Sequence, residues 1–247
     1  METDDAPEAE TGAKSTGDKE KTKPVPADRI RLRFEKRGAL KFISHHDLMR
    51  TFELALRRAD LNVAHTQGFN PRPKLSFAIA LPLGVESLDE ILDIDIEPVP
   101  RLIPEQLVEK LRPQMPAGIV LREAWRAVGR PRVLACQYQV ELELVPARLI
   151  EVGSRLAEFL HGGALMHSRS RGRGKTARTL DVRAFTQAAS LDASTLTMTL
   201  AFTPQGGMKP TDLLEILGID PLAQRVIKTR TLFEEDPLAD TVPAPLP

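Results

Sequence analysis

The sequence has 247 residues, of which 42% are hydrophobic, enough apolar material to bury the core of one large or two small domains. Its single cysteine, Cys136, excludes a disulfide framework and any zinc or iron–sulfur site built from several cysteines. No stretch approaches ~18 consecutive apolar residues, and the polar start METDDAPEAE lacks the apolar core of a signal peptide, so we expect no membrane segment and a cytoplasmic location.

The formal net charge of zero conceals an uneven distribution. Residues 1–28 carry eight acidic and four basic side chains, and residues 234–247 carry four acidic side chains and no basic one. The remaining residues, 29–233, contain 30 Lys and Arg against 22 Asp and Glu. A body with this excess of positive charge could attract a polyanion such as nucleic acid, although a soluble domain with acidic tails explains the same numbers.

Residues 1–28 hold almost no large apolar side chains, and we expect both 1–28 and 234–247 to be disordered tails. The first structured segment is RIRLRF, residues 29–34, whose strict alternation predicts a half-buried strand. Residues 44–60 then place apolar side chains at helical spacing, and Ser44 and Asp47 fit the N-cap and N3 positions of a capping box.

Four more segments complete the first half of the chain. Their patterns predict, in order, a strand, a strand, a helix and a strand: residues 74–81, 90–97, 105–112 and 119–125. The resulting order of strand, helix, strand, strand, helix, strand is typical of a ferredoxin-like domain. We therefore assign the first domain to residues 29–128.

The second half repeats this order less clearly. Residues 133–145 alternate as a strand and residues 146–160 have helical spacing. The remaining predicted elements are three strands, a short helix and a last strand: residues 164–168, 178–184, 194–203, 210–217 and 224–233. The predicted fold is therefore α+β, with two tandem ferredoxin-like (βαββαβ) domains, 29–128 and 131–233, between disordered acidic termini.

The start of the first predicted helix is a candidate binding site. His45 and His46 lie beside the positive end of the helix dipole, which favours neutral imidazole. Such a histidine near Asp47 and Arg50 could bind a phosphate or base edge or act as a general base, but a polar first turn explains the same residues. Adjacent histidines are a poor metal pair, and no second base completes a triad. The predicted binding residues here are Ser44, His45, Asp47 and Arg50, with His45 the one catalytic candidate and no metal.

The segment HTQGFNPRPKLSF, residues 65–77, predicts a stiff basic loop. Gly68 permits a positive φ, and Pro71 and Pro73 fix φ, so the loop is shaped before any ligand binds. Its amides, cations and aromatic ring suit an RNA phosphate or an unpaired base, whereas a rigid connection with a buried Phe69 is the alternative. We expect the loop to form one pocket with the helix start. The predicted binding residues are Gln67, Gly68, Phe69, Asn70, Arg72 and Lys74.

The segment SRSRGRGKTAR, residues 168–178, concentrates positive charge among Ser and Gly. Nothing in it can pack, so it is either a nucleic-acid contact with steep salt dependence or a flexible insertion made soluble by charge. We predict that it contacts the nucleic-acid backbone through Arg169, Arg171, Arg173, Lys175 and Arg178.

Three acidic side chains, Asp93, Asp95 and Glu97, are predicted on the outward face of one strand. Together they could hold Mg²⁺, or they could pair with Arg31 and Arg33 on a neighbouring strand. We predict the pairing, and hence no metal and no RNA lying on the open sheet.

The stretch KFISHHDLMRTFELALRRADLNVAHTQGFNPRPKLSFAIALPLGVESLDEILDI resembles the signature region of the radical-SAM-linked domain family. The resemblance rests on a Ser-His-x-Asp helix start, on Gln-Gly-Phe-Asn-Pro-x-Pro-Lys and on a Leu-Pro-x-Gly-Val turn. It is dense over residues 30–97 and thinner to about residue 233. Ser44, His45 and Asp47 match, and His46 falls at a variable position. These are bacterial proteins of unknown function encoded beside, or fused to, a radical SAM protein.

The resemblance implies that the chain has a radical SAM protein as its partner, but it implies no specific reaction for the chain itself. Radical SAM enzymes hold a [4Fe–4S] cluster through a CxxxCxxC motif, which a chain with one cysteine lacks, so we expect no cofactor in this chain. The expected function is an accessory protein of a radical SAM enzyme that binds or presents RNA for modification. Two alternatives stay open: an acid–base RNA-cleaving enzyme that uses His45, and a module that docks a radical SAM partner without nucleic acid.

Overall fold

The computed structural model describes residues 28–97, 101–169, 178–203 and 206–237. The first half contains β1 (Asp28–Lys36), α1 (His45–Arg58), β2 (Leu75–Phe77), β3 (Glu86–Ile96), α2 (Pro104–Leu111) and β4 (Ile119–Arg126). The second half contains β5 (Val133–Glu141), α3 (Pro146–His161), β6 (Met166–Arg169), β7 (Arg178–Asp181), α4 (Val182–Phe185), β8 (Thr186–Asp192), β9 (Thr195–Thr203), β10 (Gly206–Gly207), α5 (Pro210–Ile216) and β11 (Arg225–Phe233). None of the helices in these ranges is long and apolar enough to cross a membrane.

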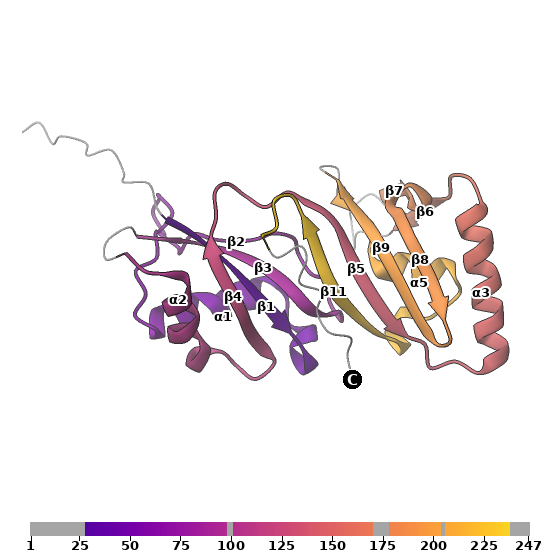
Figure 1. Cartoon of the computed structure of the whole chain (residues 1–247), viewed down its shortest axis with the longest axis horizontal. Helices are drawn as coiled ribbons and strands as arrows, with labels where there is room; N and C mark the ends of the chain where they lie inside the picture. Colours follow the sequence, from indigo (N-terminus) through magenta and orange to yellow (C-terminus); the bar gives the residue numbers. More distant parts are fainter. Residues whose placement is uncertain (1–27, 98–100, 170–177, 204–205, 238–247) are drawn as a thin grey trace, which may run out of the picture.

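The described strands form one nine-stranded sheet and a separate hairpin of β6 and β7. In each half, four strands pair antiparallel in corresponding order, β2-β3-β1-β4 and β8-β9-β5-β11. A short parallel contact between β11 and β3 joins the two halves, and Figure 1 shows the strands from β4 to β8 side by side across the molecule. The protein is therefore α+β, as predicted, with a large and mostly antiparallel sheet.

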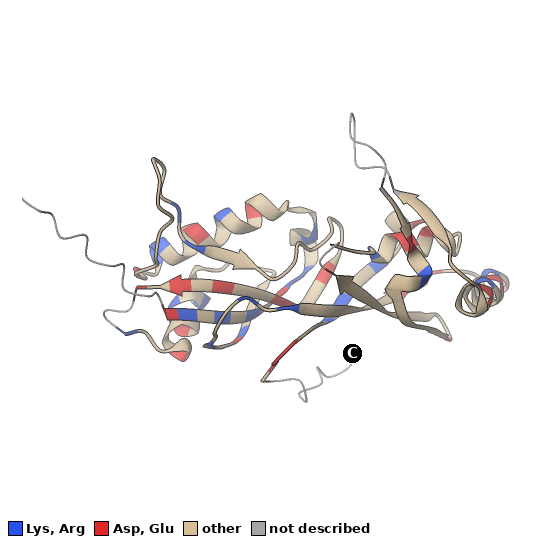
Figure 2. Ribbon diagram, turned by 90° about the horizontal axis from the view of Figure 1, so that it is seen from above, with Lys and Arg blue, Asp and Glu red and all other residues tan. Residues whose placement is uncertain are grey.

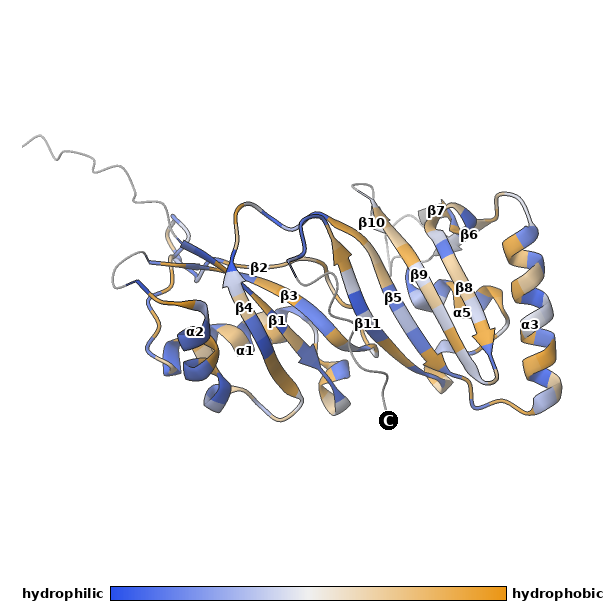
Figure 3. Cartoon of the chain, in the orientation of Figure 1, coloured by the Kyte–Doolittle hydropathy of each residue, from blue (hydrophilic) through white to orange (hydrophobic). Residues whose placement is uncertain are grey.

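Each half has its own apolar core. In the first, α1 and α2 pack on the sheet, and Phe34 of β1 meets Phe52 of α1 edge to face with ring centroids 4.9 Å apart. In the second, α3 and α5 contribute buried side chains such as Val152 and Leu213. The alternation of blue and orange along the strands in Figure 3 follows from the two-residue period of a strand, which places successive side chains on opposite faces.

The strand predicted at 74–81 is wrong in its length, because β2 ends at Phe77. Beyond it, Ile79 and Leu81 leave the sheet and pack against the core of the second half. The alternating apolar residues are therefore buried as predicted, but Ile79 and Leu81 are buried against the second half and not within the sheet of the first half.

The strand prediction for the second half is also wrong in detail. Residues 166–169 and 178–181 form the separate hairpin, and the outer strand of the large sheet is β8, which was not predicted. β8 reads TQAASLD, and short or polar side chains such as Ala188 and Ser190 give little β-strand signal.

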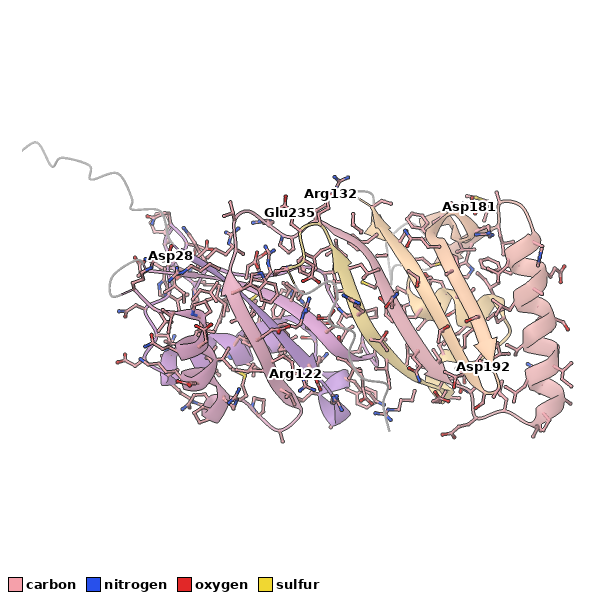
Figure 4. The ribbon with its side chains drawn as sticks, viewed as in Figure 1. Asp28, Arg122, Arg132, Asp181, Asp192 and Glu235 are labelled. Atoms are coloured by element: carbon pink, nitrogen blue, oxygen red, sulfur yellow. The ribbon has the colours of Figure 1, made fainter. Side chains whose placement is uncertain are left out.

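The structured part extends slightly into both predicted tails. Asp28 already belongs to β1, and its carboxylate accepts a hydrogen bond of 2.5 Å from Arg126. At the other end, the buried carboxylate of Asp236 accepts from Arg33 at 2.8 Å. Figure 4 places Glu235 near Arg132, which itself pairs with Glu234 at 2.8 Å.

A buried ion pair lies where the halves meet. The Nζ of Lys228 on β11 is 2.5 Å from the carboxylate of Glu90 on β3, and the two side chains are 0% and 2% exposed. Burial disfavours the ammonium, but Glu90, with help from Cys136 and Asp89, outweighs it, so the pKa of Lys228 is raised. Lys228 is therefore held in its charged form, and removing either partner would leave the other unpaired in the interior.

We predict that Lys228→Met and Glu90→Met each lower the free energy of unfolding by about 3–5 kcal/mol, because each leaves a buried charge without its partner. The double variant should recover part of that loss, since an apolar pair has no charge to desolvate. Urea denaturation of all four proteins measures this coupling. Arg132→Ala, which breaks an exposed pair, is the control and should cost less than about 1 kcal/mol; additive losses in the double variant would contradict the prediction.

Candidate functional site

The start of α1 is held by a capping box. The backbone N–H of Asp47 donates to Ser44 Oγ at 3.1 Å, and the Asp47 carboxylate accepts from the Ser44 backbone N–H at 3.3 Å and from its hydroxyl at 2.7 Å. The predicted capping box is confirmed. The Ser44 hydrogen bonds also hold the pKa of Asp47 below its usual value. Both side chains are therefore engaged in starting the helix, which leaves less of their capacity for a ligand.

His45 lies against Phe77 at the end of β2. Their ring centroids are 5.1 Å apart in an edge-to-face arrangement, and the His46 ring is 6.2 Å away. Partial burial lowers the pKa of His45, and His46 and Lys36 lower it further, while the carboxylate of Glu90 acts in the opposite direction. The imidazole is thus biased toward its neutral form.

Residues 64–74 form a small hairpin that extends beyond β2. The N–H of Lys74 donates to the carbonyl of Ala64, and the N–H of Thr66 donates to the carbonyl of Arg72, each at 2.8 Å. The N–H of Arg72 also donates to the Thr66 hydroxyl at 3.1 Å. At the tip, Gly68 has a φ of 147°, a conformation that favours glycine. The whole loop is therefore tied at its base and open at its tip.

Phe69 stands at this tip with its side chain in solvent, at 107% of the reference exposure. The expectation of a buried Phe69, which belonged to the alternative of a rigid connection, is therefore wrong. Gln67 and Asn70 are exposed beside it.

The helix start and the loop do not form one pocket. His45 contacts Phe77, which pairs with Leu92, whereas the loop emerges where Lys74 bonds Asp95, at the other end of β2. The helix between them is 14 residues long, or roughly 21 Å at 1.5 Å per residue. The expectation of a shared site is therefore wrong. The sequence places the loop next to β2 but does not show which end of β2 faces the start of α1.

The base of the loop instead follows the last turn of α1 closely in the chain. Only Ala59 to Val63 separate this turn from the hairpin. Arg57 and Arg58 of the turn, like Arg72 and Lys74 of the loop, are exposed. Within the described ranges, none of these four makes an ion pair. We call this set, with Phe69, the α1–loop surface.

The arginines of β1 are in a different situation. Arg29 is 2.7 Å from Asp95, Arg31 is 2.7 Å from Asp93, and Arg33 is 2.8 Å from Asp89. The predicted cross-strand pairing is confirmed for Arg31, whereas Arg33 pairs with Asp89. Figure 2 shows these positive and negative positions following each other along the strands. No group of three or more potential metal ligands occurs in the described residues.

The basic segment at 168–178 belongs to the other half. Arg171, Arg173 and Lys175 lie outside the described residues, so their prediction stays untested. Arg169 and Arg178 are directly opposite each other in the β6–β7 hairpin. The segment therefore begins and ends at neighbouring positions, far along the chain from the α1–loop surface.

A cleft between the halves was not predicted. It has a volume of about 370 Å³ and is lined from the first half by Ile79 to Leu83 and from the second by Tyr138, Phe202 and Met208. Burial raises the pKa of Tyr138 and of the neighbouring thiol of Cys136, so neither is poised as a nucleophile at neutral pH.

We predict that His45 titrates below 6.5 in the folded protein, because burial disfavours its charged form. Since the unfolded chain then binds this proton more readily, the contribution of His45 to stability is present above pH 6.5 and is lost as pH falls through its folded pKa. NMR titration of the imidazole signals and urea unfolding at several pH values test this. His45→Gln should remove that part of the pH dependence, and an unshifted titration would contradict the prediction.

The comparisons with known proteins give a family but no activity. The model of a family described as "Uncharacterized protein conserved in bacteria (DUF2344)" matches residues 29–210. No curated protein matches the sequence. Among solved structures, the crystal structure of a Cbf5-Nop10-Gar1 complex is similar with a TM-score of 0.37 and 12% identity. That match covers 82% of this chain and 48% of the other.

Proposed function

Because the chain belongs to the bacterial DUF2344 family of uncharacterized proteins, we propose a function from its surface: the α1–loop surface binds RNA. In this proposal the protein is an accessory protein that presents the bound RNA to a radical SAM enzyme for modification. The proposal concerns binding, with the chemistry carried out by the partner.

The single observation that supports RNA binding is the contrast between two groups of cations in the same half. The arginines of β1 form ion pairs with carboxylates of β3, with distances of 2.7–2.8 Å from the arginine Nε to the aspartate Oδ1. Arg57, Arg58, Arg72 and Lys74 are exposed and have no such partner among the described residues. Cations that the fold does not neutralise are available to phosphates, and each phosphate neutralised releases counterions.

The loop also meets the second requirement for binding, which is a small loss of entropy. Its base is fixed by the hydrogen bonds between Ala64 and Lys74 and between Thr66 and Arg72. Pro71 and Pro73 restrict the backbone on either side of Arg72. A surface that is already ordered gives up less freedom when it binds.

The radical SAM partner rests on the resemblance of the Ser-His-x-Asp and Gln-Gly-Phe-Asn-Pro-x-Pro-Lys segments to the radical-SAM-linked family, and on the single cysteine, which cannot hold a cluster. We also propose that the two halves are tandem ferredoxin-like repeats. The corresponding antiparallel orders β2-β3-β1-β4 and β8-β9-β5-β11 support this.

A second candidate function is acid–base cleavage of RNA by His45, which the lowered pKa of this histidine favours. Neutral imidazole at neutral pH is the form that a general base requires. His45→Ala should then abolish turnover of an RNA substrate while leaving its binding unchanged. Binding without any cleavage by the wild-type protein would exclude this candidate.

We predict that Arg72→Ala/Lys74→Ala weakens RNA binding and lowers the slope of log affinity against log salt by about 1.4, since each phosphate contact on a single strand contributes about 0.7. Filter binding of total RNA across a salt series measures both quantities. The matched control is Lys110→Ala/Arg112→Ala, which removes two exposed cations from the end of α2. Equal effects of the two double variants, or no RNA binding at low salt, would refute the proposal.

The partner has its own test. A radical SAM protein encoded by the neighbouring reading frame should co-purify with this chain when the two are produced together. If the chain acts as an RNA-presenting accessory, nuclease treatment should not dissociate the pair but should remove RNA bound through the α1–loop surface. A stable pair that never carries RNA would favour the docking module without nucleic acid.

A further inference from the structure

We propose that the RNA recognised by the α1–loop surface is single-stranded and that one unpaired nucleobase stacks on the ring of Phe69. This inference rests on the proposed function and adds the class of RNA and the residue that selects it. It follows from three features: the exposed ring, the tied loop that carries it, and the cations beside it.

The exposure of Phe69 needs an explanation. When it is buried, a phenylalanine side chain removes ~150–250 Å² of surface from water, which stabilises a protein. Here the ring is fully exposed, although the same half buries Phe34 and Phe52 completely. Phe69 therefore contributes no burial energy to folding. The same apolar surface could contribute to binding when a partner covers it.

The loop presents this ring in a fixed place. Its backbone is tied at two levels, by the pair Ala64–Lys74 and by the pair Thr66–Arg72, and the turn at Gly68 follows. Only the tip, residues 67–71, extends beyond these bonds. A ring held out on a tied hairpin can stack on a flat ligand without first ordering the loop.

Two cations follow the ring on the same hairpin. Pro73 forms an isolated bridge with His65 across the hairpin, and Arg72 and Lys74, the residues on either side of Pro73, are both exposed. Asp95, which is half-buried and whose backbone N–H bonds the carbonyl of Lys74, is already bound by Arg29 at 2.7 Å. The surroundings of Phe69 therefore favour a polyanion that carries flat apolar groups, which describes RNA.

The magnitudes favour an unpaired base over a duplex. In a duplex the base faces already stack on each other, so a ring can be inserted only after a base step is unstacked, and this opposes binding. One aromatic contact strengthens binding by only about 5- to 150-fold. A single ring therefore does not offset the opening of a duplex, whereas an unpaired base offers its face without that cost.

The test compares one sequence in two forms. An RNA of about 12 nucleotides containing 2-aminopurine is used as a single strand and as a duplex with its complement, with the full chain as wild type, Phe69→Ala and Phe69→Trp. Wild type should bind the single strand at least about tenfold more tightly than the duplex and quench 2-aminopurine fluorescence. Phe69→Ala should lose about 5- to 150-fold in affinity for the single strand without a change in salt slope, and Phe69→Trp should retain it.

The control is Leu222→Ala, which removes another apolar side chain that is 96% exposed and belongs to the second half. Equal binding of both RNA forms, or a Phe69→Ala variant that binds like wild type, would overturn this inference while leaving RNA binding through the cations intact. Failure of all RNA binding would overturn both proposals together. Loss of radical SAM co-purification in Phe69→Ala, with RNA affinity unchanged, would assign the ring to a protein partner instead.

Discussion

The contact between β3 and β11 is the constraint on which the rest of the structure depends. Only two residue pairs, Ile227 with Glu86 and Lys228 with Ser87, are in register between these strands, yet they join the two halves into one sheet. Side chains reinforce this short contact: Thr231 donates through its backbone N–H and its hydroxyl to Asp89, each at 2.6 Å. The buried pair of Lys228 and Glu90 lies beside it. Polar interactions at the junction thus replace much of what a longer strand pairing would supply.

The ion pairs of β3 also determine which cations remain unpaired on the surface. Acidic side chains of β3 serve the interior and the sheet: Glu90 binds Lys228, Asp89 binds Arg33, and Asp93 binds Arg31. Because these carboxylates are taken, the excess of positive charge over residues 29–233 falls on groups elsewhere. The net charge of a protein therefore says less about binding than the identity of the cations that remain unpaired.

Local patterns in the sequence predicted local structure well. The capping box of Ser44 and Asp47 follows from bonds between near neighbours, so it could be predicted without the fold. The alternation of residues 29–34 correctly predicted a strand, but the expectation that it is half-buried is wrong: β1 is buried on both faces, because Arg31 and Arg33 are covered where they pair with Asp93 and Asp89. The early end of β2, the edge strand β8 and the separation of His45 from the loop could not be predicted, because each depends on contacts between distant segments. The exposure of Phe69 also depends on the fold, since an aromatic residue in a sequence reads equally as core or surface.

The position of β11 affects how the chain folds during its synthesis. It is the last of the described strands in the chain, yet it lies in the middle of the sheet, between β3 and β5. On a ribosome, β3 and β5 are synthesised before β11. Each of them lacks its neighbour on one edge until residues 225–233 emerge. Pairing across such long separations is slow, and unpaired edges attract other chains. The bridge between the halves is thus also the step at which a nascent chain is most exposed to aggregation.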